Sequence, residues 1–105
     1  MIDSNSVAAL QDFLESKGTS LRPYGSAEFA LQRKDAILFL DLIEKVNGQP
    51  LGIEVWKRVA NGLSIDALGG WYSDSASHAD NLASASEFVC GPLVSDDDLF
   101  TIQFD

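Results

Sequence analysis

The chain has 105 residues, of which 46% are hydrophobic, and its 16 acidic residues against 7 basic ones give a formal net charge of -9. This length is enough to bury one hydrophobic core, so we expect a single domain over residues 1–105. The longest apolar run, Ala36–Leu40, is far too short to span a membrane, and the N-terminus lacks the basic start and apolar stretch of a signal peptide. We therefore expect a cytoplasmic protein that makes no membrane contact.

The charge is unevenly distributed along the chain. All seven basic residues precede residue 59, whereas residues 59–105 carry eight acidic residues and no Lys or Arg, which is a formal charge of -8. Such a field repels nucleic acid and anionic membranes, and it speeds the encounter with a basic partner. Solubility alone is an equally simple reason for this charge.

The first predicted element is a helix over residues 5–17. Ser4 or Ser6 can cap its start, Gly18 can end it, and its apolar residues recur at helical spacing. These residues are Val7, Leu10, Phe13 and Leu14. The following segment, Thr19–Gly25, contains a proline and has no periodicity, so it predicts a connecting loop.

A second helix is predicted to run from Ser26 to the Asn47-Gly48 pair. This stretch contains no Gly or Pro until its end, and apolar residues gather on one side of it. They are Ala36, Phe39, Leu40, Ile43 and Val46. Ala36–Ile43 taken alone could be a strand, but strands average only about five or six residues, so the length of the segment favours a helix.

A β-hairpin is predicted after Pro50. Apolar and polar residues alternate over Ile53–Arg58, and the Asn61-Gly62 dipeptide that follows is typical of a type I′ turn. Leu63–Ala67 resumes the alternation on the return strand. The paired glycines Gly69-Gly70 predict a bulge or bend before Trp71 and Tyr72.

The last predicted elements are a helix over residues 76–90, which the Gly91-Pro92 pair ends, and a strand over Phe100–Phe104. Between them, Asp96–Asp98 is expected to be a solvated turn. The approximate order ααββαβ predicts an α+β fold, in which helices pack on one face of a small, largely antiparallel sheet.

The residue types that carry catalysis or bind metals are scarce. Cys90 is the only cysteine and His78 the only histidine, so we expect no cofactor and no metal site. His78 lies between Asp74 and Asp80, and an enzyme that uses this group is one alternative; we expect instead an exposed histidine near a helix start. Cys90 is expected to be a small buried residue.

Three large aromatic residues stand out in the predicted hairpin: Trp56, Trp71 and Tyr72. Large aromatics beside acidic residues are typical anchors of protein interfaces. They are also normally well buried, so core packing is the competing interpretation, and it is the favoured one for Trp56.

The predicted strand Pro50–Trp56 reads Pro-Leu-Gly-Ile-Glu-Val-Trp, and the later segment Gly70–Asp74 reads Gly-Trp-Tyr-Ser-Asp. These two segments resemble the sequences of a family of small bacterial immunity proteins, which belong to polymorphic toxin and contact-dependent growth inhibition systems. The resemblance extends over roughly residues 28 to 90.

The resemblance implies a protein that neutralises a cognate toxin by binding it, without catalysis. The expected partner is a basic toxin domain, such as a nuclease, because its phosphate-binding groove complements an acidic inhibitor. The mechanism would be steric and electrostatic occlusion. We place the contact surface on the acidic half of the chain, with the partner-binding residues Asp66, Trp71, Tyr72, Asp74, Asp80 and Glu87.

A secretion chaperone is the alternative from another class of binding protein. Such chaperones are also small, acidic cytosolic α/β proteins, but they are characteristically homodimers that hold an unfolded segment of a secreted partner. The sequence leaves open the oligomeric state of this chain and the identity of its toxin.

Overall fold

A computed structural model describes residues 3–74 and 77–105, with only the backbone described at residues 67 and 68. The described residues form three α-helices, one 3₁₀-helix and five strands. In chain order these are α1 (Ser4–Lys17), β1 (Thr19–Ser20), η1 (Arg22–Tyr24), β2 (Phe29–Gln32), α2 (Arg33–Lys45), β3 (Pro50–Val59), β4 (Gly62–Tyr72), α3 (His78–Cys90) and β5 (Leu99–Phe104).

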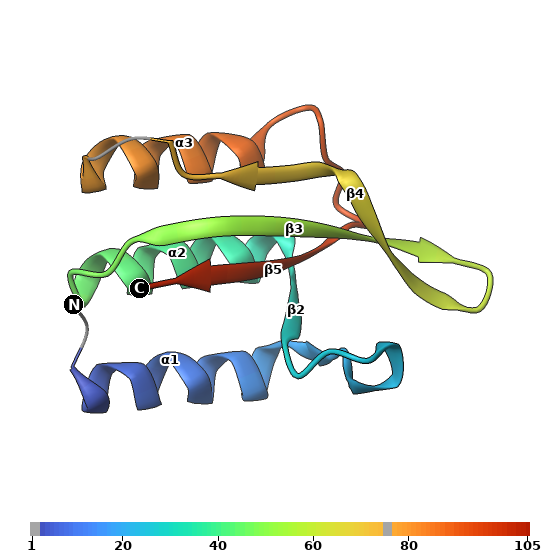
Figure 1. Ribbon diagram of the computed structural model, residues 1–105, viewed down its shortest axis with the longest axis horizontal. Coiled ribbons are helices and arrows are strands. Elements are labelled where there is room, and N and C mark those ends of the chain that lie inside the picture. Colours follow the sequence, from blue (N-terminus) through green and yellow to red (C-terminus); the bar gives the residue numbers. More distant parts are fainter. Residues whose placement is uncertain (1–2, 75–76) are drawn as a thin grey trace.

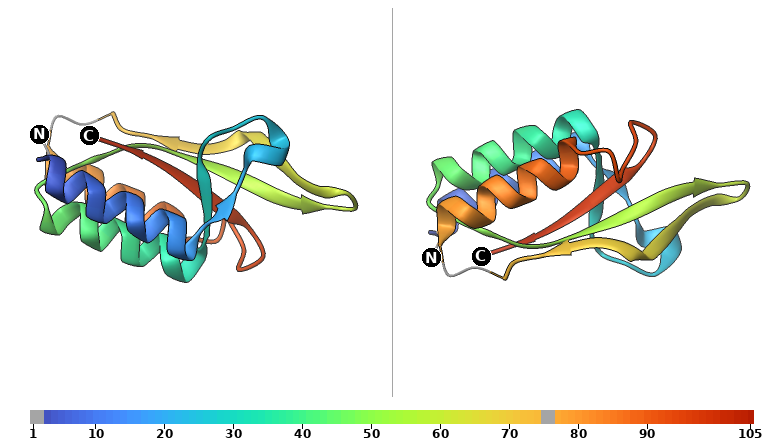
Figure 2. Two further views of the ribbon diagram at one scale, coloured as in Figure 1. Left: turned by 90° about the horizontal axis from the view of Figure 1, so that it is seen from below. Right: turned by 90° about the horizontal axis from the view of Figure 1, so that it is seen from above.

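The strands form one antiparallel sheet in the order β1-β2-β5-β3-β4. The three α-helices lie side by side in a second layer, with α2 between α1 and α3 (Figure 1). They all cover the same face of the sheet, as the views from below and above show (Figure 2). The predicted α+β fold with helices on one face of an antiparallel sheet is therefore confirmed.

The start of the second helix was predicted wrongly. Phe29–Gln32 forms β2, and α2 begins only at Arg33. Leu31 pairs with Phe100 of β5, so a strand at the other end of the chain fixes the conformation of a segment that has no local helix breaker. The expected loop Thr19–Gly25 also contains regular structure, namely β1 and η1.

Most helix ends lie close to their predicted positions. Gly18 ends α1 and Gly91 ends α3. α2 stops where Asn47 adopts a left-handed φ of 61° and the Gly48 N–H donates to the Ile43 carbonyl at 2.9 Å. The cap of α1 differs from the prediction, because Asp3, and not a serine, accepts a hydrogen bond from the Ser6 N–H at 2.8 Å.

The hairpin of β3 and β4 is confirmed, but its turn is not of type I′. Val59 pairs with Gly62, which leaves Ala60 and Asn61 as the loop. Gly62 has a φ of 131°, whereas Asn47 is the only non-glycine with positive φ among the described residues. The turn is shaped by a distant contact, since the Leu63 N–H donates to the Tyr24 hydroxyl at 3.1 Å. The tip of the hairpin projects beyond the helices (Figures 1 and 2).

The predicted bulge before the two aromatics is also confirmed. Ile53 pairs with Trp71 and Val55 with Asp66, so four residues of β4, 67–70, lie opposite the single residue Glu54. Close packing requires Gly70, because a Cβ on this residue would lie 2.9 Å from the Ile53 carbonyl oxygen. The extra residues shift β4 so that Trp71 lies against the helix layer.

The main core lies between the sheet and the helices. Its fully buried members come from every layer and include Leu10, Leu31, Phe39, Leu40, Ile43, Ile53, Val55, Val89 and Phe100. Phe39 is central, because its ring lies 5.6 Å from that of Phe13 and 5.5 Å from that of Phe104. Burial of such side chains is the dominant stabilising term of a domain this size.

The other face of the sheet is not covered by the three α-helices. At one end of it, Trp56 is buried in a small cluster with Leu21, Ala30 and Leu99, and its ring lies 6.1 Å from that of Tyr24. The core interpretation of Trp56 is thus confirmed.

The middle of this uncovered face is polar. The Gln103 Nε2 donates to Glu28 at 2.7 Å and to Glu54 at 3.5 Å. The hydroxyl of Thr101, a buried residue, donates to Glu54 at 3.4 Å. This uncovered polar network links β3 to β5 and to the residue that precedes β2.

Two expectations about single residues are wrong. Cys90 is exposed, because it lies five residues after Ala85, which places it on the opposite side of α3 from that buried residue. Asp98, expected in a solvated turn, has a side chain only 4% exposed. It accepts hydrogen bonds from the Lys57 ammonium and the Ser95 N–H, each at 2.9 Å.

Candidate protein-binding surface

Trp71 has a structural role. It lies on the helix-covered side of β4, and its indole N–H donates to the Ser84 hydroxyl at 2.8 Å. Its ring packs against the main core. Trp71 therefore links α3 to the edge strand of the sheet. Only part of the Trp71 surface remains accessible to a partner.

Tyr72 points the other way, because successive residues of a strand face opposite sides of the sheet. It pairs with Gly52, and a Cβ on that glycine would lie 3.0 Å from the tyrosine ring. The side chain is 64% exposed. Trp71 and Tyr72 thus do not form one joint anchor.

Asp66 lies beside the β4 bulge. It pairs with Val55, and a Cβ on Gly69 would clash with its carboxylate. Asp66 takes part in an interaction within the chain. Its position indicates that it supports the bulge.

The remaining three predicted residues are exposed acids on the β4–α3 side of the molecule. Asp74 follows β4, Asp80 lies in the first turn of α3, and Glu87 lies farther along the same helix. Asp80 and Glu87 are two helical turns apart and therefore share one side of α3. An acid in the first turn is also favourable for the helix itself.

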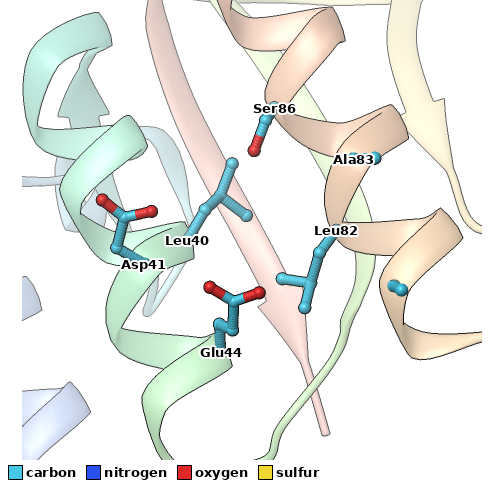
Figure 3. A pocket seen from close by; sticks show the side chains of 7 residues that line it. Leu40, Asp41, Glu44, Leu82, Ala83 and Ser86 are labelled. Carbon is cyan, nitrogen blue, oxygen red and sulfur yellow. The ribbon is translucent and has the colours of Figure 1, made fainter.

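A groove that was not predicted from the sequence lies between α2 and α3. It encloses about 220 Å³. Figure 3 shows Leu40 and Leu82 pointing toward each other across it, with the Asp41 and Glu44 carboxylates on the α2 side and the Ser86 hydroxyl on the α3 side. Ala79 and Ala83 complete the lining. The sequence feature that could have indicated this site is the pair of acids three residues apart beside the buried Leu40. The groove itself depends on how the two helices pack.

The carboxylates of the groove have no counter-ion within the described part of the chain. The ion pairs there join Arg33 to Asp96 at 3.4 Å and Lys57 to Asp98 at 2.9 Å. Of the basic residues of α2, Arg33 and Lys34 lie in its first turn, whereas Lys45 directly follows Glu44 in the last turn and lies four residues after Asp41. Together with two acids of α3, the groove carboxylates form the acidic helical surface, which we define as Asp41, Glu44, Asp80 and Glu87.

His78 is the first residue of α3 and is exposed, as expected. Within residues 3–74 and 77–105, no three His, Cys, Asp or Glu side chains are grouped so that they could hold a metal ion. None of the helices described here has the length and apolar character needed to cross a membrane.

Comparison with models of known protein families gives no match for this chain, and comparison with curated proteins also gives none. The similarity of residues 50–74 to immunity proteins therefore stays a prediction from the sequence.

Proposed function

We propose that this protein is an immunity-type inhibitor that binds and neutralises a cognate toxin domain in the cytoplasm, without catalysis. The observation that carries the proposal is the acidic helical surface, whose two groove carboxylates, Asp41 and Glu44, have no ion-pair partner among the described residues. It belongs to a chain with a net charge of -9 and no basic residue after Arg58.

The proposed partner is a nuclease toxin domain. Such a domain holds phosphates in a basic groove, and an acidic surface can cover that groove or its rim. Long-range attraction would set the association rate, whereas close packing would set the residence time. Inhibition then needs only steric and electrostatic occlusion.

The first test is a pull-down of the tagged protein from lysate of its native host, followed by calorimetry with the recovered partner at low and at high salt. We expect a folded toxin domain bound at about nanomolar affinity or better, and weaker binding at high salt. Recovery of a homodimer that holds an unfolded secretion substrate would contradict the inhibitor proposal and support the secretion-chaperone alternative.

A charge-reversal pair tests the surface itself. Asp80→Lys with Glu87→Lys should slow association with the toxin domain in stopped-flow measurements. The matched control is Asp12→Lys with Glu15→Lys, because both acids are exposed on α1, on the far side of α2 from α3 (Figure 1). Equal slowing by both pairs would show that only total charge matters.

A further inference from the structure

The α2–α3 groove combines an apolar floor with a charged rim. Leu40 is buried at its base and Leu82 is half-buried beside it. Asp41 and Glu44 stand on one rim and are exposed, whereas the other rim carries only the small residues Ala79, Ala83 and Ser86. The carboxylates of the rim therefore attract a cation, and the apolar floor favours contact with an aliphatic group.

The size of the groove limits what can fill it. Its volume of about 220 Å³ is below the roughly 300 to 1,000 Å³ of sites for small-molecule ligands and cofactors. It is several times the about 30 Å³ that one water molecule occupies. A single long side chain fits this space. It can enter the groove from the open side between the two helices.

We propose that the groove receives one arginine side chain of the bound toxin domain. Its aliphatic stem packs on Leu40 and Leu82, and its guanidinium pairs with the carboxylates of Asp41 and Glu44. The two acids are three residues apart on a helix and are therefore neighbours on its surface. A planar guanidinium with five N–H donors can engage both, whereas a lysine ammonium offers only a point charge.

No cation among the described residues forms an ion pair with either groove carboxylate. Lys45 directly follows Glu44 and lies four residues after Asp41, which makes it a neighbour on the helix surface, but it pairs with neither acid, and Arg33 is engaged by Asp96. The inference rests on the proposed function for the identity of the partner, but the arginine preference of the groove can be tested without it.

The first experiment uses a small probe. N-acetyl-arginine amide is titrated into ¹⁵N-labelled protein, with N-acetyl-citrulline amide as the uncharged probe of nearly the same shape. We expect amide shifts at Asp41, Glu44 and Ser86 with the arginine probe only. The Asp41→Asn/Glu44→Gln variant should lose these shifts. The control Asp12→Asn/Glu15→Gln removes the same charge at the same spacing on α1 and should keep them.

Three results would overturn the arginine site. The first is an equal response to both probes, which would show that charge has no part in binding. The second is a set of shifts spread over all exposed acids and reduced equally by both variant pairs, which would show only a general attraction to the negative surface. The third is an absence of shifts in the groove.

The second experiment fills the groove. Ala83→Leu places a larger side chain on its rim, and Ala9→Leu makes the same change on α1, where Ala9 is also exposed in a helix. We expect Ala83→Leu to weaken binding of the toxin domain by about tenfold or more, as for an interface position that matters. Ala9→Leu should leave the affinity unchanged.

The outcomes separate the two proposals. If a toxin domain binds the unchanged protein and the Ala83→Leu variant equally well, the groove is not an anchor, although the inhibitor function stands. If no toxin domain is recovered at all, the proposed function fails, and the arginine titration still decides the chemistry of the groove.

Discussion

The two faces of the sheet are made by alternate residues of the same strands, yet they are held in place by different forces. On the helix-covered face, Ile53, Val55 and Phe100 are fully buried in apolar surroundings. On the uncovered face, Glu54 and Gln103 are half-buried and joined by a hydrogen bond. Apolar burial scales with the area removed from water, whereas a hydrogen bond that water can replace contributes little net stability. The comparison indicates that the covered face stabilises the fold, and that the polar middle of the uncovered face, unlike the buried Trp56 cluster at its end, can change with little cost.

The largest expected effect comes from the covered face. Phe100→Ala removes a fully buried ring and should lower the free energy of unfolding by about 3–5 kcal/mol. Urea denaturation measured by circular dichroism checks this. Tyr72→Ala is the control on the uncovered face and should cost less than about 1 kcal/mol, because that side chain is 64% exposed. Similar losses for the two variants would contradict the comparison.

An intermediate effect is expected where a polar group is buried. Asp98→Asn removes the charge that pairs with Lys57 and should cost about 1–3 kcal/mol at neutral pH. Because Lys57 is partly exposed, the expected loss of stability is smaller than for a fully buried ion pair. Asp97→Asn is the matched control, since Asp97 is the exposed neighbour, and it should leave the stability unchanged.

The pH dependence of the same pair sharpens the test. Burial alone would raise the pKa of Asp98, but the hydrogen bonds from Lys57 and Ser95 and the lysine charge together hold it below the ordinary 3.8. A carboxyl whose pKa is lowered by folding stabilises the protein above its unfolded pKa, and this contribution is lost as the pH falls through the folded value. The difference in the free energy of unfolding between wild type and Asp98→Asn should therefore be constant at pH values well above 3.8, the ordinary pKa, and shrink as the pH falls through and below that value. A difference independent of pH down to acid unfolding would show that charge is not involved.

The smallest effect is expected from the uncovered polar network. Gln103→Met removes the donor that bridges Glu28 and Glu54 and should cost about 1 kcal/mol or less, since water can solvate both half-buried carboxylates. Gln11→Met on α1 is the control, where the residue is exposed. A loss that equals the Phe100→Ala value would show that the network holds the sheet together.

The elements that could be predicted from sequence are those with local signals. Gly18 and Gly91 mark the ends of two helices, and the hairpin of β3 and β4 follows from residue alternation. β2 could not be predicted, because its residues run into α2 without a breaker and become a strand through pairing with β1 and with the distant β5. The burial of Asp98 among three consecutive aspartates depends equally on a distant group, the Lys57 ammonium.

The candidate site shows the same division. Exposure of Asp80 and Glu87 on one side of α3 follows from helical periodicity, and the opposite directions of Trp71 and Tyr72 follow from strand alternation. The α2–α3 groove could not be predicted, since it exists only where two helices from separate parts of the chain pack together. The charge of this surface could therefore be predicted from the sequence, but its shape could not.

The bulge in β4 has a consequence for how copies of this protein behave together. β4 is an outer strand of the sheet, and an unbroken outer strand offers a template on which another chain can form β-structure. Residues 67–70 interrupt the regular pairing of that strand, and β1 at the opposite edge has only two residues. Neither border of the sheet presents a long regular row of backbone donors and acceptors. The bulge that brings Trp71 to α3 therefore also protects the protein against edge-to-edge polymerisation.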